Sequence, residues 1–271
     1  MAGMSQDEIR RYRDDGYVVP GFRLAAEKVA RVRNTLDALI RANPNVRPER
    51  LVSAHIEGEN SEGVRGSRAF LDLAMDFDIV DLVCDAIGPD VILWGCQVFC
   101  KPGGDGMEVP WHQDGHYWPI RPLATCTVWL ALDPSRRENG CLRVIPGSHR
   151  SHTLFDHLRE DRGDVVLTQR VDSAAFDENA AVDVALAPGQ MSLHDVYMIH
   201  GSNPNRSPLR RAGVAIRYMP ATSRFDRTLM APSDASGYKV DFTRRPLWLL
   251  RGHDRTGAND FTIGHAPEAA E

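Results

Sequence analysis

The feature of this sequence that most limits its fold is a series of short apolar segments between residues 90 and 220. Six of them are DVILWGCQVFCK, TCTVWLALD, CLRVIPG, AVDVALAPG, QMSLHDV and AGVAIRYMP. Asn-Gly, Pro-Gly and Gly-Ser pairs, which favour tight turns, punctuate this region. Segments of this length with such turns are typical of β-strands. Their number predicts an antiparallel double-sheet barrel or jelly roll.

The first 88 residues show helical periodicity instead. Ser5 and Glu8 match a capping box, which predicts a short helix that runs toward Asp15 and is followed by a strand at GYVVPGF. Apolar residues recur at three- and four-residue steps over residues 24–42, and Asn43-Pro44 ends that pattern. Two further helical segments are expected, at 68–75 and 78–87.

Helices followed by many short strands predict a mainly β fold with α elements. We expect a double-stranded β-helix, that is, a jelly roll or cupin-like barrel, buttressed by N-terminal helices. A barrel of this kind can form one domain at a length of 271 residues. The expected domain is therefore 1–271, with a helical buttress at about 5–88, a barrel core at about 90–220 and a C-terminal extension at about 221–271.

Charge and apolar pattern restrict the partners. The net charge is −5 and the pI is near 6.1, which disfavours nucleic acid and anionic membranes as partners. The N-terminus lacks the apolar core of a signal peptide, and no apolar run approaches the roughly 18 residues needed to span a bilayer. Five cysteines without a CxxC pair predict buried free thiols. We therefore expect a cytoplasmic protein, either a monomer or a homodimer, that acts on a small molecule.

The segment EVPWHQDGHYWPIRP, residues 108–122, concentrates polar and aromatic groups where a plain strand would need only alternation. His112 and Asp114 are two residues apart, so on a strand their side chains share one face. Two histidines and one carboxylate form the facial triad of non-haem Fe(II) oxygenases. Both His200 and His194 have the strand parity of a third ligand, and a His–Asp pair alone can also be a surface hydrogen bond.

Three blocks in this order, HQDGHYWPIRP, NGCLRVIPGSH and HGSNPNRSPLRRA, closely resemble the phytanoyl-CoA dioxygenase family of Fe(II)/2-oxoglutarate oxygenases. The resemblance covers roughly residues 90–220. It implies that His112, Asp114 and His200 bind the iron, with 2-oxoglutarate and O2 as co-substrates. Related halogenases have Gly or Ala at the aspartate position, so Asp114 argues against halogenation.

The same resemblance implies a set of 2-oxoglutarate contacts. Arg211, eleven residues after His200, matches the arginine that holds the 5-carboxylate, a role suited to a planar two-pronged donor. Ser202 matches a serine that supports this carboxylate, while Gln97 and Trp129 fall where family members contact or wall the co-substrate. Core packing is an alternative role for Trp129. The neighbouring Arg210 is expected to be a solvated charge.

Other residues are candidates for substrate contact. His116, Tyr117 and Trp118 follow the metal pair on an expected loop at the barrel mouth, although Trp118 could instead be core. Arg217 could reach an anionic substrate group from the barrel wall, or form a surface ion pair. The segment GENSEGVRGS has the composition either of a plain solvated loop or of a mobile loop beside the site.

The resemblance implies hydroxylation of an unactivated C–H bond, with release of succinate and CO2, and the acidic composition favours a small soluble metabolite as substrate. Natural-product intermediates, phosphonates and amino-acid-like compounds are the expected substrates. The same iron site could instead support cyclisation, desaturation, epimerisation or acyl-CoA 2-hydroxylation. A metal-free double-sheet binding protein is an alternative of another class, but it would not need the three ligands and Arg211 together.

Overall fold

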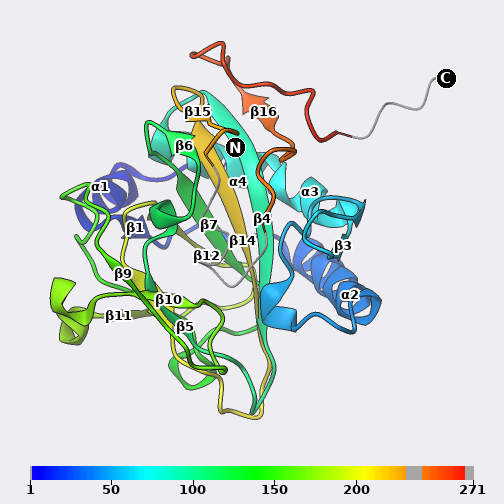
Figure 1. The fold of residues 1–271 in the computed structure, drawn as a ribbon, viewed down its shortest axis with the longest axis vertical. Coiled ribbons are helices and arrows are strands. Elements are labelled where there is room, and N and C mark those ends of the chain that lie inside the picture. The colour runs from blue at the N-terminus through cyan, green and yellow to red at the C-terminus, as the bar shows by residue number, and fades with distance from the viewer. Residues whose placement is uncertain (1, 230–239, 266–271) are drawn as a thin grey trace.

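Two long strands, β4 (Val91–Lys101) and β14 (Arg211–Pro220), lie side by side at the centre of the structure (Figure 1). The structure is a computed structural model that describes residues 2–229 and 240–265. They belong to a six-stranded sheet with the order β1 (Tyr17–Val18), β12 (Met191–Asp195), β7 (Cys126–Ala131), β14, β4 and β16 (Trp248–Arg251). A four-stranded sheet has the order β11 (Val182–Val184), β8 (Leu142–Val144), β13 (His200–Ser202) and β5 (Val109–His112). Two sheets of this kind confirm the predicted jelly roll.

Side chains of β14 alternate between the two faces of the larger sheet, as the period of two requires. The face toward the helices carries Ala212, Val214, Ile216 and Tyr218. The face toward the interior of the barrel carries Arg211, Gly213, Ala215 and Arg217. The polar groups of this strand therefore point into the space between the sheets, where burial would otherwise favour apolar side chains.

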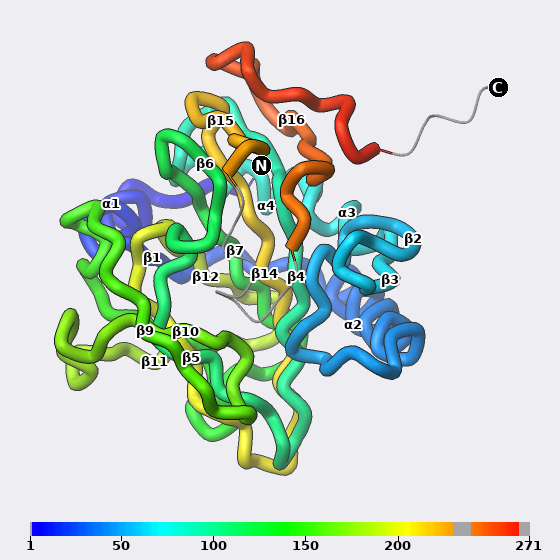
Figure 2. The backbone as a smooth tube through the Cα atoms, in the orientation of Figure 1, coloured from blue at the N-terminus to red at the C-terminus, as the bar shows by residue number. Residues whose placement is uncertain are grey.

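The helices occupy the N-terminal part of the chain, as predicted, and lie beside the larger sheet (Figures 1 and 2). They are α1 (Gln6–Asp15), α2 (Ala26–Ala42), α3 (Arg68–Ala74) and α4 (Phe77–Ile87). The capping box is confirmed, because the Ser5 hydroxyl accepts from the Glu8 N–H and the Glu8 carboxylate accepts from the Ser5 N–H. Helix α4 packs on β4, β7 and β14, so the buttress and the sheet share one apolar core.

The segment GENSEGVRGS is more ordered than its composition suggests. It contains the strands β2 (Gly58–Glu59) and β3 (Arg65–Gly66), which pair as a hairpin. The Asn60 carboxamide oxygen accepts from the N–H groups of Glu62 and Val64, at 3.1 and 2.9 Å, and so closes the turn. The expectation of a plain loop was therefore wrong in this respect.

Several short strands were not predicted. Strands β9 (His157–Arg159) and β10 (Gln169–Val171) pair with each other, as do β6 (Ile120–Arg121) and β15 (Arg224–Phe225). Strand β16 lies in the C-terminal extension and joins the edge of the larger sheet beside β4. Phe242 and Leu247 of the same extension pack against Trp94 and Trp118. The extension therefore forms part of the barrel wall.

The five cysteines are free thiols, four of them buried, which agrees with the prediction. Burial raises the pKa of the Cys96, Cys100 and Cys126 thiols to about 12, so these groups stay protonated and apolar. Among the residues that the structure describes, no helix is both long enough and apolar enough to cross a membrane.

Candidate active site

Three buried side chains converge between the two sheets. His112 ends β5, His200 begins β13, and the two residues are direct partners across these antiparallel strands. Asp114 lies just beyond β5 in a 3₁₀ turn, not on the strand as expected, yet its carboxylate still approaches His112, with 3.7 Å between Nε2 and Oδ1. One ligand atom from each of the three residues lies within 4.8 Å of the others. This donor set fits a divalent metal that prefers nitrogen and oxygen.

Backbone carbonyls fix the orientation of both histidine rings. His112 Nδ1 lies 2.8 Å from the Pro110 carbonyl oxygen, and His200 Nδ1 lies 3.0 Å from that of Met198. A carbonyl oxygen can only accept, so each Nδ1 must carry the proton. Each Nε2 then presents its lone pair to the cluster. An outer hydrogen bond of this kind is the usual support of a metal-bound histidine.

The protonation states also suit metal binding. Burial alone would raise the pKa of the Asp114 carboxyl, but the neighbouring imidazoles of His112, His194 and His200 and the charge of Arg217 hold it well below its usual value. Burial, followed by the neighbouring His112 and His194, lowers the pKa of His200 well below its ordinary value. The site therefore combines an ionised carboxylate with a neutral imidazole.

His194, the other candidate for the third ligand, lies beside the cluster but outside it. Its Nε2 is 3.7 Å from Asp114 Oδ2, and its ring centroid is 4.6 Å from that of His200. It stands on β12 of the larger sheet, opposite Thr127, whereas His200 belongs to the smaller sheet with His112. The geometry therefore groups His200, and not His194, with the His112–Asp114 pair.

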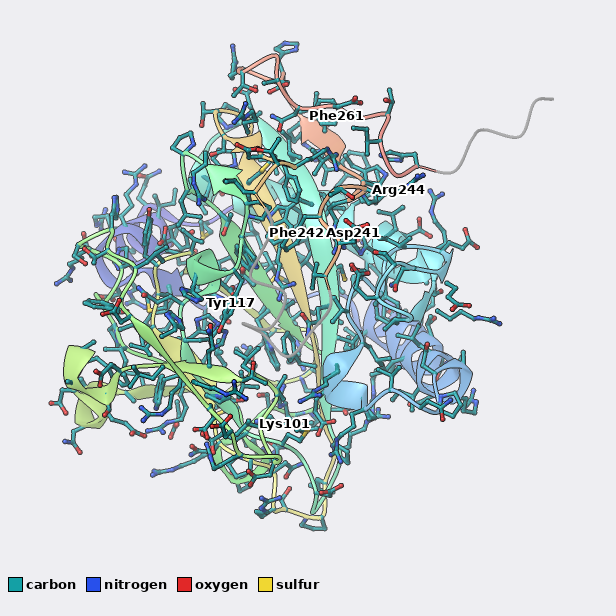
Figure 3. The ribbon with its side chains drawn as sticks, in the orientation of Figure 1. Lys101, Tyr117, Asp241, Phe242, Arg244 and Phe261 are labelled. Atoms are coloured by element: carbon teal, nitrogen blue, oxygen red, sulfur yellow. The ribbon has the colours of Figure 1, made fainter. Side chains whose placement is uncertain are left out.

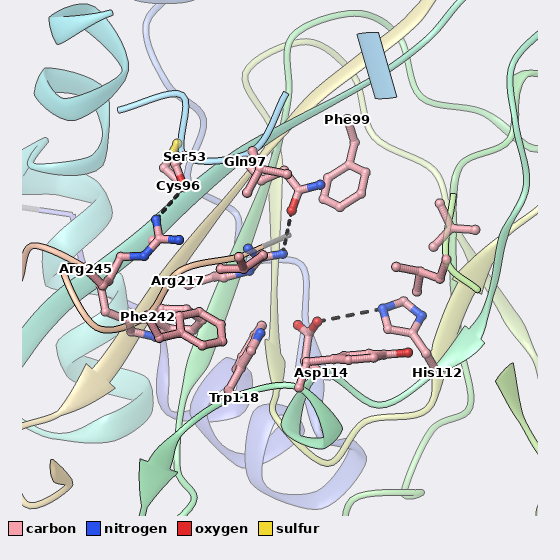
Figure 4. A pocket seen from close by; sticks show the side chains of 17 residues that line it. Ser53, Cys96, Gln97, Phe99, His112, Asp114, Trp118, Arg217, Phe242 and Arg245 are labelled. Atoms are coloured by element: carbon pink, nitrogen blue, oxygen red, sulfur yellow. Dashed lines mark hydrogen bonds and ion pairs between the residues drawn. The ribbon is translucent and has the colours of Figure 1, made fainter. Parts of the chain in front are cut away.

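Two pockets meet at this cluster. The first is lined by Trp94, Gln97, Tyr117, Trp118, Phe242 and Arg245, among others. The second is lined by Thr127, Trp129, His194, His200, Ser202 and Arg211, among others. Both share Phe99, Val109, His112, Asp114 and Arg217. Figure 4 shows the first pocket, with His112 and Asp114 at one side and Trp118, Phe242 and Arg245 at the other. A metal held by the cluster would therefore face both pockets.

Arg211 is a buried cation in the second pocket, with 2% of its surface exposed. Its Nη1 donates to the Phe99 carbonyl oxygen at 3.3 Å, and its guanidinium carbon lies 5.1 Å from the centre of the Trp129 ring. Gly213 makes room for that ring, because a Cβ there would lie 2.2 Å from a ring carbon of Trp129. No carboxylate of the described residues forms an ion pair with Arg211. Its charge is thus available to an anionic ligand.

Arg210, the neighbour of Arg211, points to the opposite face and is not a solvated charge as expected. Its Nε lies 2.8 Å from Asp133 Oδ2, and its Nη1 lies 2.6 Å from Asp37 Oδ1 on α2. Hydrogen bonds to Asp133 and Asp37 raise the pKa of Arg210, despite partial burial. The two adjacent arginines therefore differ in their charge balance. Arg210 is neutralised by the carboxylates of Asp37 and Asp133, whereas Arg211 has no carboxylate partner among the described residues.

Ser202 lies in the second pocket close to Lys101, at the end of the barrel distant from Phe242 (Figure 3). The Lys101 ammonium donates to the Ser202 hydroxyl at 2.7 Å, to the Ser202 carbonyl at 3.2 Å and to the Asn203 carbonyl. Because an ammonium can only donate, the Ser202 oxygen accepts this bond and its own proton is left for another acceptor. Burial lowers the pKa of Lys101 well below its usual value.

Gln97 does not lie in the pocket of Arg211. It lines the first pocket, where its carboxamide oxygen accepts from Arg217 Nη2 at 3.1 Å (Figure 4). The buried amide thus has the partner that burial requires. In this structure Gln97 supports Arg217, and it lies one strand beyond Trp129 on the same sheet, because both residues are partners of Ala215 on β14.

The aromatic run after Asp114 divides into two parts. Tyr117 and Trp118 line the first pocket, and the Trp118 ring meets Trp94 edge-on at 4.6 Å between centroids. His116 instead stacks on His157, 4.0 Å away, and bonds to Gln169 at 2.9 Å. Trp118 is therefore both a core residue and a pocket wall. His157 is half-buried by this stack, and burial lowers its pKa to about 3.

Several residues of the site escaped the sequence analysis. Phe99 and Lys101 follow Gln97 at steps of two on β4, so strand alternation could have revealed them. Phe242 and Arg245 enter the first pocket from the C-terminal extension, where no local pattern indicates such a role. Glu62 of the β2–β3 hairpin reaches Arg245 at 2.9 Å, which places that hairpin beside the pocket, as expected.

A jelly roll with a His-X-Asp and a distal His between two pockets defines the class of iron- and 2-oxoglutarate-dependent dioxygenases. The phytanoyl-CoA dioxygenase (PhyH) family model matches residues 12–213. The chain belongs to this family, and its enzyme class is that of an Fe(II)/2-oxoglutarate dioxygenase.

Related proteins cover most of the chain. A probable alpha-ketoglutarate-dependent hypophosphite dioxygenase of Stutzerimonas stutzeri is 26% identical over 80% of this chain and 79% of that protein. Among solved structures, the ThoJ–Ni complex, a non-heme monooxygenase, has a TM-score of 0.67 and 25% identity over 97% of this chain and 90% of its own. The epimerase SnoN in complex with Fe3+, alpha ketoglutarate and nogalamycin RO has the same TM-score and identity, over 91% and 98%.

Proposed function

We propose that this protein hydroxylates an unactivated C–H bond of a small soluble metabolite, using Fe(II) held by His112, Asp114 and His200 and 2-oxoglutarate held by Arg211. The observation that carries this proposal is the junction of two pockets at the three ligands. One pocket holds a buried cation for a co-substrate carboxylate, and the other offers aromatic rings, Trp94, Trp118 and Phe242 among them, to a second molecule. Such a division lets two molecules approach one metal from different sides.

The residues of the chain would share the work as follows. His112 Nε2, His200 Nε2 and the Asp114 carboxylate would bind the metal, while Ser202 and Arg211 would hold the distal carboxylate of 2-oxoglutarate. When bound, iron with 2-oxoglutarate and O2 supplies the oxidising chemistry and releases succinate and CO2. Trp129 would wall the co-substrate, and Tyr117 and Trp118 would orient the substrate and exclude water.

The proposed substrates are natural-product intermediates, phosphonates and amino-acid-like compounds, and relatives named for hypophosphite, ectoine and nogalamycin chemistry support this range. We also propose that the whole chain works as one catalytic domain, because Phe242 and Arg245 of the extension complete the first pocket. The buried free thiols favour the reducing cytoplasm as its location.

A metabolite panel tests the function directly. The iron-loaded enzyme with 2-oxoglutarate should release succinate faster when its substrate is present, and the product should gain one oxygen atom in mass spectrometry. A product that loses two hydrogens would indicate desaturation or cyclisation instead, and one of unchanged mass would indicate epimerisation. An enzyme that binds neither iron nor 2-oxoglutarate would contradict the proposal as a whole.

Replacing Trp118 by alanine should uncouple the two half-reactions. The ring has 6% of its surface exposed and separates the first pocket from the core, so its loss should admit water beside the ligands. We expect the ratio of succinate formed to product formed to rise, while iron and 2-oxoglutarate still bind. Both products can be quantified in the same reaction mixture.

Trp248→Ala is the matched control for this prediction. Trp248 is partly buried against the helix-side core and does not line the first pocket, so its loss should cost stability without uncoupling. A large aromatic-to-alanine change in a core costs about 3 to 5 kcal/mol, so thermal unfolding must be followed for both variants. If Trp118→Ala loses stability but keeps the wild-type ratio, the ring has only a core role.

Lys101→Met should weaken 2-oxoglutarate binding about tenfold, because a hydrogen bond to a charged group contributes about 1.5 kcal/mol. The methionine keeps an apolar stem but no longer orients the Ser202 hydroxyl. Calorimetric titration of the metal-loaded protein measures this affinity. The loss should nearly vanish in a Ser202→Ala background if Lys101 acts through Ser202. An equal loss in both backgrounds would show that Lys101 acts independently of the hydroxyl.

A further inference from the structure

Two arginines line the first pocket, but only one of them has a carboxylate partner. Arg245 Nη2 lies 2.9 Å from Glu62 Oε1, and its Nη1 donates to the Ser53 hydroxyl. Both members of this ion pair have 4% of their side-chain surface exposed. The pair therefore cancels its own charge inside the protein, and Arg245 acts as a fixed part of the wall.

Arg217 has no such compensation. Its Nη2 donates to the neutral carboxamide of Gln97, its Nε is buried without a hydrogen-bond partner, and no carboxylate of the described residues forms an ion pair with it. A guanidinium keeps its charge in any protein environment, so this position stays cationic. The low-polarity walls of the pocket make an unpaired charge costly until an anion arrives.

The surroundings of Arg217 indicate what that anion is attached to. Its guanidinium carbon lies 5.1 Å from the centre of the Trp118 ring and 5.8 Å from that of Trp94. Phe242 lines the same pocket, as Figure 4 shows. A ligand that reaches Arg217 through this pocket would therefore lay an apolar body on aromatic surfaces.

The nearby charges do not supply the missing partner. Asp114 lines the pocket, but the proposed function assigns its carboxylate to the metal. The co-substrate has partners at the other end of the second pocket, where Arg211 and Ser202 lie. Arg217 stands at the junction of the two pockets, within reach of a molecule that occupies the first.

We infer that the primary substrate is a small organic acid whose single oxyanion, a carboxylate or phosphonate, binds Arg217 while its apolar body lies against Trp118 and Phe242. This inference rests on the proposed function and adds the substrate class. Arg217, Phe242 and Arg245 all lie beyond residue 213, where the family match ends. Selectivity for the acid thus resides in the part of the pocket that the family match does not cover.

The test compares acids with their neutral counterparts. The Ni(II)-loaded protein with 2-oxoglutarate is titrated with a panel of carboxylic acids and phosphonates, each paired with its amide or ester, and tryptophan fluorescence and calorimetry report binding. At least one acid should bind about thirtyfold or more tightly than its neutral partner, the lower end of the discrimination expected for a buried charge pair. The preferred acid type, carboxylate or phosphonate, identifies the oxyanion.

Arg217→Gln should remove this preference and leave 2-oxoglutarate affinity unchanged, whereas Arg217→Lys, which keeps the charge, should retain it in weaker form. Arg210→Gln, a neutralised arginine outside the pocket, should keep the wild-type preference. A wild-type panel without any acid preference overturns the inference, as does a preference that survives in Arg217→Gln. Loss of 2-oxoglutarate affinity in that variant would assign Arg217 to the co-substrate instead. Failure of the wild-type protein to bind Ni(II) and 2-oxoglutarate would contradict the proposed function itself.

Discussion

Replacing His200 by alanine should abolish iron binding, whereas replacing His194, which lies beside Asp114 but outside the ligand set, should weaken it by no more than about 10- to 100-fold. Among the described residues, His200 is the histidine that joins His112 and Asp114 in a group whose candidate ligand atoms lie within 4.8 Å of one another. Loss of an outer-shell partner alone costs about 10- to 100-fold in metal affinity, so loss of a ligand should exceed about 100-fold. Anaerobic titration with Fe(II), repeated with the air-stable Co(II) and Ni(II), measures the difference.

The comparison is well matched, because both histidines are buried, with 6% and 2% of their surfaces exposed, and both lie beside Asp114. Both substitutions remove an imidazole of the same size from the same part of the core, so their effects on thermal unfolding should be similar. Loss of metal in His194→Ala, with metal retained in His200→Ala, would transfer the third ligand to β12 and contradict the assignment.

Replacing Arg211 by alanine should raise the 2-oxoglutarate requirement far more than the substrate requirement. The guanidinium is fully desolvated, and burial lowers its pKa to about 10, a value that still leaves it charged at neutral pH. Removing one partner of a buried charge-assisted pair costs on the order of 2 to 5 kcal/mol, or a weakening of about 30- to several-thousand-fold. Steady-state kinetics with varied 2-oxoglutarate, together with direct titration, provides both quantities.

Arg210→Ala serves as the adjacent control for this prediction. That side chain is held by Asp133 and Asp37 on the helix side of the sheet, so its loss should affect stability rather than 2-oxoglutarate. Unchanged co-substrate affinity in Arg211→Ala would exclude Arg211 as the anchor. A loss confined to Arg210→Ala would mean that the strand presents the opposite face to the pocket.

Much of the fold could be predicted because its signals are local. The Ser5–Glu8 capping box and the apolar spacing of residues 24–42 depend on backbone geometry within a few turns, and the helices begin and end close to the predicted residues. Short strands with turn residues between them likewise indicated a double-sheet barrel. The strands β9, β10 and β16 were missed, because their pairing depends on partners far along the chain or on a sheet edge.

The sequence by itself determined the relations between site residues that are close together along the chain. His112 and Asp114 are two residues apart, so a strand at this point would place their side chains on one face, and the two groups do meet although Asp114 lies just beyond β5. Arg211 and Arg210 are adjacent in the chain, so their side chains face opposite sides if the extended backbone of β14 continues to Arg210. Such statements need only the period of the backbone. They hold whichever elements pack against the strand.

Only the tertiary structure decided between His194 and His200. Both have the same parity when positions are counted along the chain, but β12 belongs to one sheet and β13 to the other, and the chain changes sheets between them. Counting in steps of two cannot predict which way a side chain points across this crossing, because residues 196–199 are not part of a strand. The same limit applies to Gln97, whose place beside Arg217 follows from cross-strand packing, and to Phe242 and Arg245, which come from a distant extension. Contacts between segments far apart in sequence are set by packing, which no local pattern encodes.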